Sequence, residues 1–398
     1  MENASRCSVC GSSLIAGRCL SCETRQWSRF VHREIVLLTI LIGVTVAAFV
    51  GTRAVALSND ALHRRQAAAW FDEAERASQG ANAETAIAGF RRAVARAPEN
   101  RQYRLALAEE LATGGLDDEA KRVLLALREA EPEDPNTNVQ LARLEARGAD
   151  ADATRRYYQN ALAGLWRPEQ AEERRRLRIE LIEFLLAHHE PDRALSELLV
   201  LAANLPEEAP LEAQVGRMFL AAGNPRLALD HSVLAIGLDS ENLDALAGAG
   251  EAAFELGDYN RALRYLNTVP QENTHAAELR ELSRLILTGD PLVPRLGANE
   301  RRRRLSAAFQ RAAERLEACL SEPSAQTNAS LAQLQREAEG FKSALERARR
   351  REPRDLADDG VDLAYRIERA VEQSCGTPAA PFDRALLLIG RRHGFEES

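Results

Sequence analysis

The longest uninterrupted apolar stretch of the chain is residues 35–52, IVLLTILIGVTVAAFVGT, 18 residues without a charged side chain. A helix of this length covers roughly 27 Å, close to the hydrocarbon thickness of a bilayer. A buried core helix usually interrupts such a run with polar residues, and a signal peptide does not usually follow a cysteine-rich segment. We therefore predict a transmembrane helix at residues 31–53, with residues 35–52 in the lipid bilayer.

After this segment, apolar residues recur every three or four positions, which is the spacing of amphipathic helices. Few aromatic residues (5%) and many charged residues (28%) are typical of a helical protein with a charged surface. We predict an all-α fold, with a linker at residues 54–66, a helical array at 67–290 and a small helical bundle at 297–393. Proline-containing breaks separate the predicted bundle helices, at residues 301–320, 330–351, 356–373 and 382–390.

Within the array, two consecutive segments of 34 residues begin at Ala67 and Arg101 and share a pattern. Position 8 is Ala74 or Ala108, position 20 is alanine, position 24 is large and apolar, and position 32 is proline. Further segments begin at residues 135, 175, 209 and 243, and a capping helix is predicted at 276–287. The pattern resembles the tetratricopeptide repeat (TPR), and an ordinary bundle would not explain the fixed period. The resemblance implies an α-solenoid of about six helix pairs.

The resemblance to the TPR family also implies a concave groove that is lined by the first helix of each pair. Such a groove binds a protein or peptide segment. The positions that match the lining of the family are Phe71, Glu75, Leu105, Glu109, Val139, Arg143, Ile179, Glu183, Arg217, Glu251 and Phe254. The subclass that clamps a C-terminal carboxylate needs lysine and asparagine in the first helix, where this chain has Phe71 and Glu75.

Four of the six cysteines lie near the start of the chain, as C-x2-C-x8-C-x2-C at Cys7, Cys10, Cys19 and Cys22. Four thiolates are the preferred ligands of a structural, closed Zn²⁺ site. The spacer is long enough for a short hairpin, and the spacing resembles the minimal zinc-ribbon family. We predict a structural zinc module within residues 1–30, which also include the segment that precedes the membrane. Two disulfides, which need an oxidising compartment, and an iron–sulfur site are the alternatives.

The orientation of the predicted membrane helix follows from charge and from thiol chemistry. Arg25, Arg29 and Arg33 precede the apolar run, although the other flank also carries arginines. Positive flanks favour the cytoplasm, and a cluster of thiolates survives best where the compartment is reducing. The excess of arginine over lysine is typical of a GC-rich bacterial genome. We predict a single-pass protein of the bacterial inner membrane, with its N-terminus cytoplasmic and its TPR region periplasmic.

The remaining candidate chemistry lies in the bundle. Cys319 and Cys375 fall near the ends of two predicted helices on the same side, so that a disulfide and two separate buried thiols are both open. The basic run Arg301–Arg304 is interpreted as a solvated start of a helix, since acidic residues nearby offset its charge. The net charge of −8 does not favour nucleic acid as a partner. Because no phosphate-binding loop and no catalytic motif occurs, we predict that the protein is not an enzyme.

Two functions are consistent with this organisation, and the sequence leaves the client and the oligomeric state open. The first is a membrane-anchored TPR scaffold that binds another polypeptide in its groove, in bacterial envelope assembly or secretion. The second is a regulatory adaptor, in which the cytosolic zinc ribbon docks or senses while the TPR array relays or recruits. A variant of the adaptor reverses the topology and puts the repeats in the cytosol.

Overall fold

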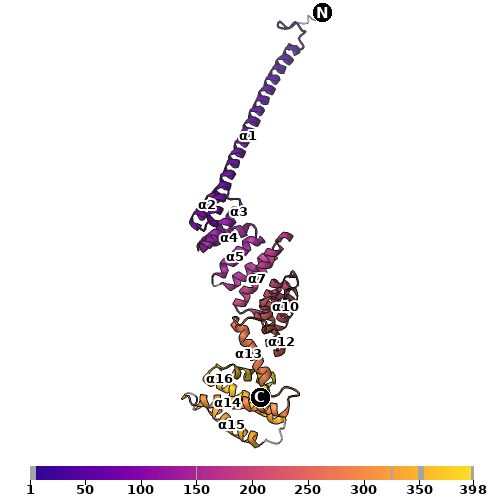
Figure 1. The fold of residues 1–398 in the computed structure, drawn as a ribbon. Coiled ribbons are helices and arrows are strands. Elements are labelled where there is room, and N and C mark those ends of the chain that lie inside the picture. Colours follow the sequence, from indigo (N-terminus) through magenta and orange to yellow (C-terminus); the bar gives the residue numbers. More distant parts are fainter. Residues whose placement is uncertain (1–5, 149, 324, 326, 348–353, 396–398) are drawn as a thin grey trace. The chain divides into compact units, whose positions relative to one another are not determined.

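The computed structural model describes residues 6–148, 150–323, 325, 327–347 and 354–395, with the backbone alone at 23–26, 28–29 and 354–355. Residues 1–5 of the predicted zinc module and 348–351 of a predicted bundle helix lie outside the described residues. Two compact units make up the chain, Met1–Leu165 and Trp166–Ser398. The described residues are mostly helical and contain only isolated β-bridges, which confirms the predicted all-α fold (Figure 1).

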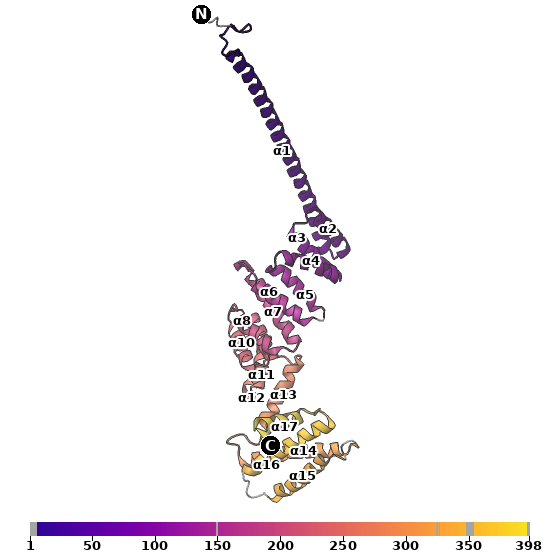
Figure 2. The same cartoon turned by 180° about the vertical axis from the view of Figure 1, so that it is seen from behind.

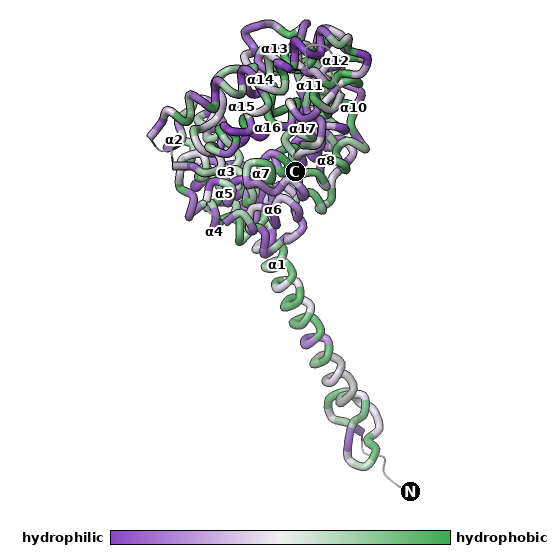
Figure 3. The backbone as a smooth tube through the Cα atoms, turned by 90° about the horizontal axis from the view of Figure 1, so that it is seen from below, coloured by the Kyte–Doolittle hydropathy of each residue, from purple (hydrophilic) through white to green (hydrophobic). Residues whose placement is uncertain are grey.

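The first unit contains a helix of 60 residues, α1 (Leu20–Gln79) (Figure 1). Its most apolar part has a mean hydropathy of 2.5, and none of that window is buried. The long free part of α1 is largely green, the hydrophobic colour, in Figure 3. By its length and composition this helix is able to cross a membrane.

The linker that we predicted at residues 54–66 is wrong, since these residues continue α1 without a break. Residues 52–79 contain neither glycine nor proline, so no residue in this stretch forces a helix to end. The helix ends at Gly80, directly before Ala81, which has a left-handed φ of 56°. One helix therefore contains the apolar segment, the stretch expected as a linker and the first helix of the first repeat.

The rest of the first unit packs as successive helix pairs, of which the first consists of the end of α1 and α2. These helices are α2 (Ala83–Arg96), α3 (Arg101–Thr113), α4 (Asp117–Ala130), α5 (Pro135–Ala146) and α6 (Ala151–Ala163). Asparagine or aspartate side chains cap four of them by accepting a hydrogen bond from a backbone N–H. Ala74 and Ala86 are fully buried where α1 crosses α2, and a Cβ on Gly89 would lie 2.8 Å from the Cβ of Ala74. The helices thus approach too closely there for larger side chains.

The second unit begins with a short 3-10 turn and continues the alternation of paired helices. Its elements are η1 (Pro168–Gln170), α7 (Ala171–Ala187), α8 (Pro191–Ala202), α9 (Ala209–Ala221), α10 (Pro225–Leu238), α11 (Leu243–Glu255), α12 (Tyr259–Leu266) and α13 (Thr274–Gly289). A Cβ on Gly250 would lie 2.5 Å from the side chain of Leu266, so a larger residue at position 8 of this repeat would have to displace that side chain. Ala194, Ala228 and Ala262, at position 20, are fully buried.

A four-helix bundle completes the second unit (Figure 2). Its helices are α14 (Ala298–Leu320), α15 (Ala329–Arg347), α16 (Arg354–Cys375) and α17 (Pro381–Arg392). Phe309, Leu331, Leu363 and Ile367 belong to its core. The α17 helix also packs on the capping helix α13, so that the bundle and the end of the helical array share a buried contact.

The basic run at the start of α14 contacts the protein itself. The guanidinium of Arg304 donates to the carbonyl oxygens of Leu287 and Asp290, at 3.1 Å each, at the C-terminal end of α13. Arg302 donates to the carbonyl oxygen of Leu345 at 3.0 Å, at the C-terminal end of α15. The carbonyl ends of helices carry partial negative charge, which explains why cations are stable beside them.

Candidate functional site

The four N-terminal cysteines converge in space. All four Sγ atoms lie within 4.8 Å of one another, with the Cys7 and Cys22 sulfurs 3.8 Å apart and the Cys10 and Cys19 sulfurs 3.3 Å apart. A tetrahedral Zn²⁺ with ligands at about 2.3 Å requires sulfur atoms roughly 3.8 Å from one another. The donor set and its spacing therefore fit a closed metal site.

Local backbone geometry brings the two cysteine pairs together. Gly11 follows the first pair with a φ of 78°, and its N–H donates to the carbonyl oxygen of Cys7 at 3.0 Å. The spacer forms a two-residue hairpin turn, in which Ile15 and Arg18 exchange backbone hydrogen bonds of 3.1 Å. Both turn residues, Ala16 and Gly17, have positive φ, as a type I′ turn requires. The hairpin expected in the spacer is present.

The protonation of the cluster also suits a cation. Hydrogen bonding with Ser12 lowers the pKa of the Cys10 thiol to about 6. Contacts with Cys10 and then Cys19 raise the pKa of Cys22 to about 12. The mutual proximity of the sulfurs thus disfavours four thiolates unless a positive charge lies between them. A divalent ion would supply that charge.

The residues that the TPR resemblance assigns to the groove divide into two groups. Phe71, Val139 and Phe254 are buried, with exposed fractions of 6%, 8% and 8%, so their assignment to a binding surface is wrong. The ring of Phe71 packs on Phe90 and Tyr103, with centroids 5.4 Å and 4.6 Å away. These side chains fill the space between helices and are not available to a partner.

The remaining groove positions are exposed or half-buried, and three of them link the first helices of successive repeats. In the first unit, Glu109 on α3 accepts a hydrogen bond of 2.6 Å from Gln140 on α5. In the second unit, Arg217 on α9 pairs with Asp244 on α11 at 2.8 Å, and Glu251 on α11 pairs with His275 on α13 at 3.2 Å. The positions that keep an accessible surface are Glu75, Leu105, Glu109, Arg143, Ile179, Glu183, Arg217 and Glu251.

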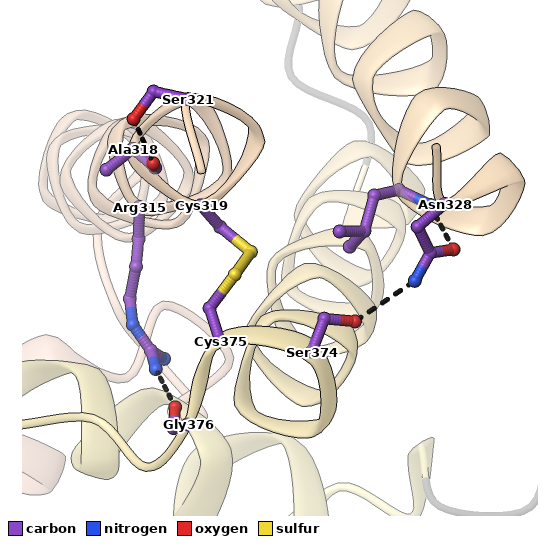
Figure 4. Close-up of a disulfide and its surroundings, with 9 residues drawn as sticks. Arg315, Ala318, Cys319, Ser321, Asn328, Ser374, Cys375 and Gly376 are labelled. Carbon is purple, nitrogen blue, oxygen red and sulfur yellow. Dashed lines mark hydrogen bonds between the residues drawn. A yellow bond between two sulfur atoms is a disulfide. The ribbon is translucent and has the colours of Figure 1, made fainter. Parts of the chain in front are cut away.

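In the bundle, Cys319 at the end of α14 and Cys375 at the end of α16 are joined by a disulfide, with their Cα atoms 5.9 Å apart (Figure 4). Arg315 donates to the carbonyl oxygen of Gly376 at 2.9 Å beside it. On the other side, Asn328 donates to Ser374 at 3.1 Å. These contacts hold the C-terminal end of α16 against α14 and the start of α15.

Two ion pairs beside this bridge have no counterpart in the sequence predictions. Arg311 forms a bidentate pair with the buried Asp383, at 2.6 Å and 2.9 Å, and Arg315 pairs with Glu368, which has no exposed surface. Burial raises the pKa of Glu368 to about 7, while Arg315 opposes that rise. The partners lie 72 and 53 residues apart, so no local motif could have revealed them.

Comparison with known proteins identifies part of the helical array. Residues 219–286, from the end of α9 to α13, match the family model of the tetratricopeptide repeat. This match covers part of the region where the pattern of small residues predicted the repeats. No curated protein matches the chain.

Several solved structures share the helical architecture at low similarity. PilW, a type IV pilus biogenesis factor, has 18% identity and a TM-score of 0.39, over 54% of this chain and 96% of its own. YrrB, a TPR protein with an unusual peptide-binding site, has 18% identity and a TM-score of 0.35, over 49% and 95%. PilF of Pseudomonas aeruginosa has 17% identity and a TM-score of 0.35, over 62% and 98%. With TM-scores below 0.5, these similarities have no bearing on what this chain binds.

Proposed function

We propose that this protein is a single-pass membrane protein whose TPR helices bind another polypeptide on the far side of the membrane from its zinc module. The observation that carries the proposal is the fully exposed apolar part of α1, placed between the cysteine cluster and the helix pairs. A long apolar surface that the protein does not cover is stable in lipid and not in water. Stacked TPR helix pairs form extended surfaces that bind other molecules.

The two sets of cysteines support a cytosolic N-terminus and periplasmic repeats, as in a bacterial inner membrane. The four sulfurs before the apolar segment are unbridged and arranged for a metal. The two cysteines after it are bridged. Thiolate clusters persist in reducing compartments, and structural disulfides persist in oxidising ones. A membrane between the two sets provides both conditions.

In this proposal the zinc ion is structural. The Sγ atoms of Cys7, Cys10, Cys19 and Cys22 would occupy all four positions of a tetrahedral ion and would leave none open for a substrate. The module has too few residues to bury a core of its own, so that metal binding would supply its folding free energy.

The client would contact the exposed positions on the first helices of the repeats. In the second unit these include Ile179 and Glu183 on α7, together with Arg217 on α9. Apolar and charged side chains of both signs alternate there, which suits an extended or helical peptide segment. We propose envelope assembly or secretion as the process, because the repeats would face the periplasm.

The regulatory adaptor remains a second candidate, because the cysteine module carries exposed apolar side chains. Val9 is 84% exposed and Ile15 is 63% exposed, on the two turns that surround the sulfurs. A cytosolic partner that covers both residues would make the module a docking element rather than a metal-stabilised start of the chain.

Topology is the first experiment. Paired reporters, one active only in the periplasm and one only in the cytosol, are fused after Ala56 and after Ser398. The proposal predicts periplasmic activity at both positions. Cytosolic activity at both positions would refute the periplasmic scaffold and leave a membrane-tethered cytosolic adaptor.

Client binding is tested in the full chain with a photocrosslinking residue at Glu183. The matched control carries the same residue at Leu234, which is 55% exposed on α10, a second helix of a pair. We expect a discrete crosslinked polypeptide from Glu183 and none from Leu234. Equal yields at the two positions would contradict binding through the first helices.

A further inference from the structure

A basic pocket lies between the start of α7 and the end of α8, and none of the positions assigned to the groove lines it. Its volume is about 450 Å³, in the range of ligand sites. Four arginines line the pocket together with apolar walls. These arginines are Arg167, Arg174, Arg175 and Arg178, and none of the residues that line the pocket carries a carboxylate.

The arginines reach one pocket because of their helical spacing. Arg174 and Arg175 lie four and three positions before Arg178, so each shares a face of α7 with it. The acidic residues of the same turn are engaged elsewhere: Glu172 pairs with Arg176, and Glu173 accepts a hydrogen bond of 3.2 Å from Gln170. The first turns of α7 therefore separate their charges by sign, with the positive face toward the pocket.

Only part of this positive charge is neutralised by the protein. Arg178 pairs with Glu197 on α8 at 3.0 Å. Arg167 contacts the neutral amide oxygen of Gln170 at 3.4 Å. Arg175 is half-buried, and no hydrogen bond or ion pair engages it among residues 166–323. A half-buried guanidinium without an anion is stabilised when a carboxylate occupies the space before it.

The walls of the pocket favour a peptide over a small inorganic ion. Trp166, Pro168, Val200 and Leu201 contribute apolar surface beside the guanidinium groups, and Val200 is 45% exposed. An acidic side chain next to an apolar one would satisfy both kinds of surface. A hydrated phosphate ion would leave the apolar walls in water.

We propose that this pocket binds an acidic segment of a polypeptide, with a glutamate or aspartate carboxylate on Arg175 and a neighbouring apolar side chain against Val200. The inference rests on the proposed polypeptide-binding function and names the chemistry of the client. It adds a contact outside the groove positions, so that one client could be held at two places.

The test measures binding of dye-labelled peptides to the full chain in nanodiscs of neutral lipid. One peptide alternates glutamate with leucine, and its partner has glutamine in place of each glutamate. We expect the glutamate peptide to bind at least about tenfold more tightly, from the cost of losing a hydrogen bond to a charged group. Arg175→Gln should remove most of that preference, whereas Arg175→Lys should keep part of it.

Arg176→Gln is the matched control, because it removes the same charge from the same helix on the face that Glu172 neutralises. Its binding should stay within about twofold of the parent. Equal binding of the two peptides, an equal loss in Arg175→Gln and Arg176→Gln, or no binding of the glutamate peptide would each overturn the inference. Displacement of the peptide by a low concentration of inorganic phosphate would show that the pocket is a site for small ions, and this result would also overturn the inference.

The photocrosslinking experiment keeps the two proposals apart. Crosslinking from Glu183 together with unchanged binding by Arg175→Gln would refute the pocket and leave the scaffold. Binding of the glutamate peptide at Arg175 without any crosslink from Glu183 would support the pocket and refute client binding at the groove positions.

Discussion

Removal of the disulfide gives the sharpest prediction about the second unit. The bridge joins Cys319 to Cys375 across a sequence separation of 56 residues. By chain entropy, closing a loop of that length stabilises the folded state by about 4 kcal/mol at 25 °C. Cys319 is also 3% exposed and belongs to the bundle core, so its loss affects packing as well.

The perturbation is the double substitution Cys319→Ala and Cys375→Ala, compared with the parent chain with and without a thiol reductant. The readout is hydrogen exchange followed by mass spectrometry, which resolves peptides from the bundle and from the repeats separately. A loss of about 4 kcal/mol corresponds to roughly a thousandfold faster exchange wherever exchange requires the bundle to unfold. Peptides from α2 to α5 should exchange at the parent rate.

The controls are built into the comparison. Reductant should accelerate exchange of the parent bundle and leave the double variant unchanged, because the variant has no bridge to reduce. Bundle exchange that is equal in all four samples would refute the argument from loop closure. Two reactive thiols in the bundle of protein isolated under thiol-blocking conditions would show that the bridge does not form in cells, and would contradict the oxidising compartment.

Three further predictions address the other parts of the chain. Cys10→Ala should lower the zinc content, measured by mass spectrometry of the metal, from one ion per chain to none, with bundle exchange unchanged. In denaturant titrations, Gly250→Ala should lower the free energy of unfolding by about 1–2 kcal/mol, because its Cβ would lie 2.5 Å from Leu266. Gly237→Ala is the control: its Cβ would meet nothing within 4 Å, so it should raise the free energy of unfolding by about 1 kcal/mol. Burial raises the pKa of Glu368 from 4.5 to about 7, so the stability that this group contributes should be greatest below pH 4.5 and should fall by up to about 3 kcal/mol as pH rises to 7. Glu368→Gln should abolish that slope; an unchanged slope in the variant would assign it to other groups.

The repeat frame and the cysteine module could be predicted because their signals are local and periodic. A small residue every 34 positions marks where two helices touch, and Ala74, Ala108 and Ala142 are indeed fully buried. The continuity of α1 could not be predicted from composition. Ser58, Asn59 and Asp60 look like turn residues, yet each costs less than about 1 kcal/mol in a helix, and no glycine or proline follows them until Gly80.

The groove was predicted only in part, because the period of a repeat does not say whether a long side chain bends inward. Phe71 and Phe254 occupy groove-lining positions of their repeats, as several exposed residues do. Their rings nevertheless pack against neighbouring aromatic side chains in the core. The role of the arginine run was missed for another reason. The acceptors of Arg302 and Arg304 are backbone carbonyl oxygens at helix ends, which leave no mark in the side-chain sequence.

The two sulfur chemistries constrain each other through the apolar helix between them. A reducing compartment keeps the sulfurs of Cys7 and Cys10 available for a metal, but it also opens an ordinary disulfide. An oxidising compartment keeps Cys319 and Cys375 bridged, but it also tends to oxidise exposed pairs of thiols. In a single compartment, bound zinc would have to protect the first set, or burial would have to slow the reduction of the second. A membrane-spanning α1 explains both sets directly, since each set then lies in the compartment that preserves it. The topology experiment therefore also decides whether one cause, the membrane, accounts for the survival of both the disulfide and the metal site.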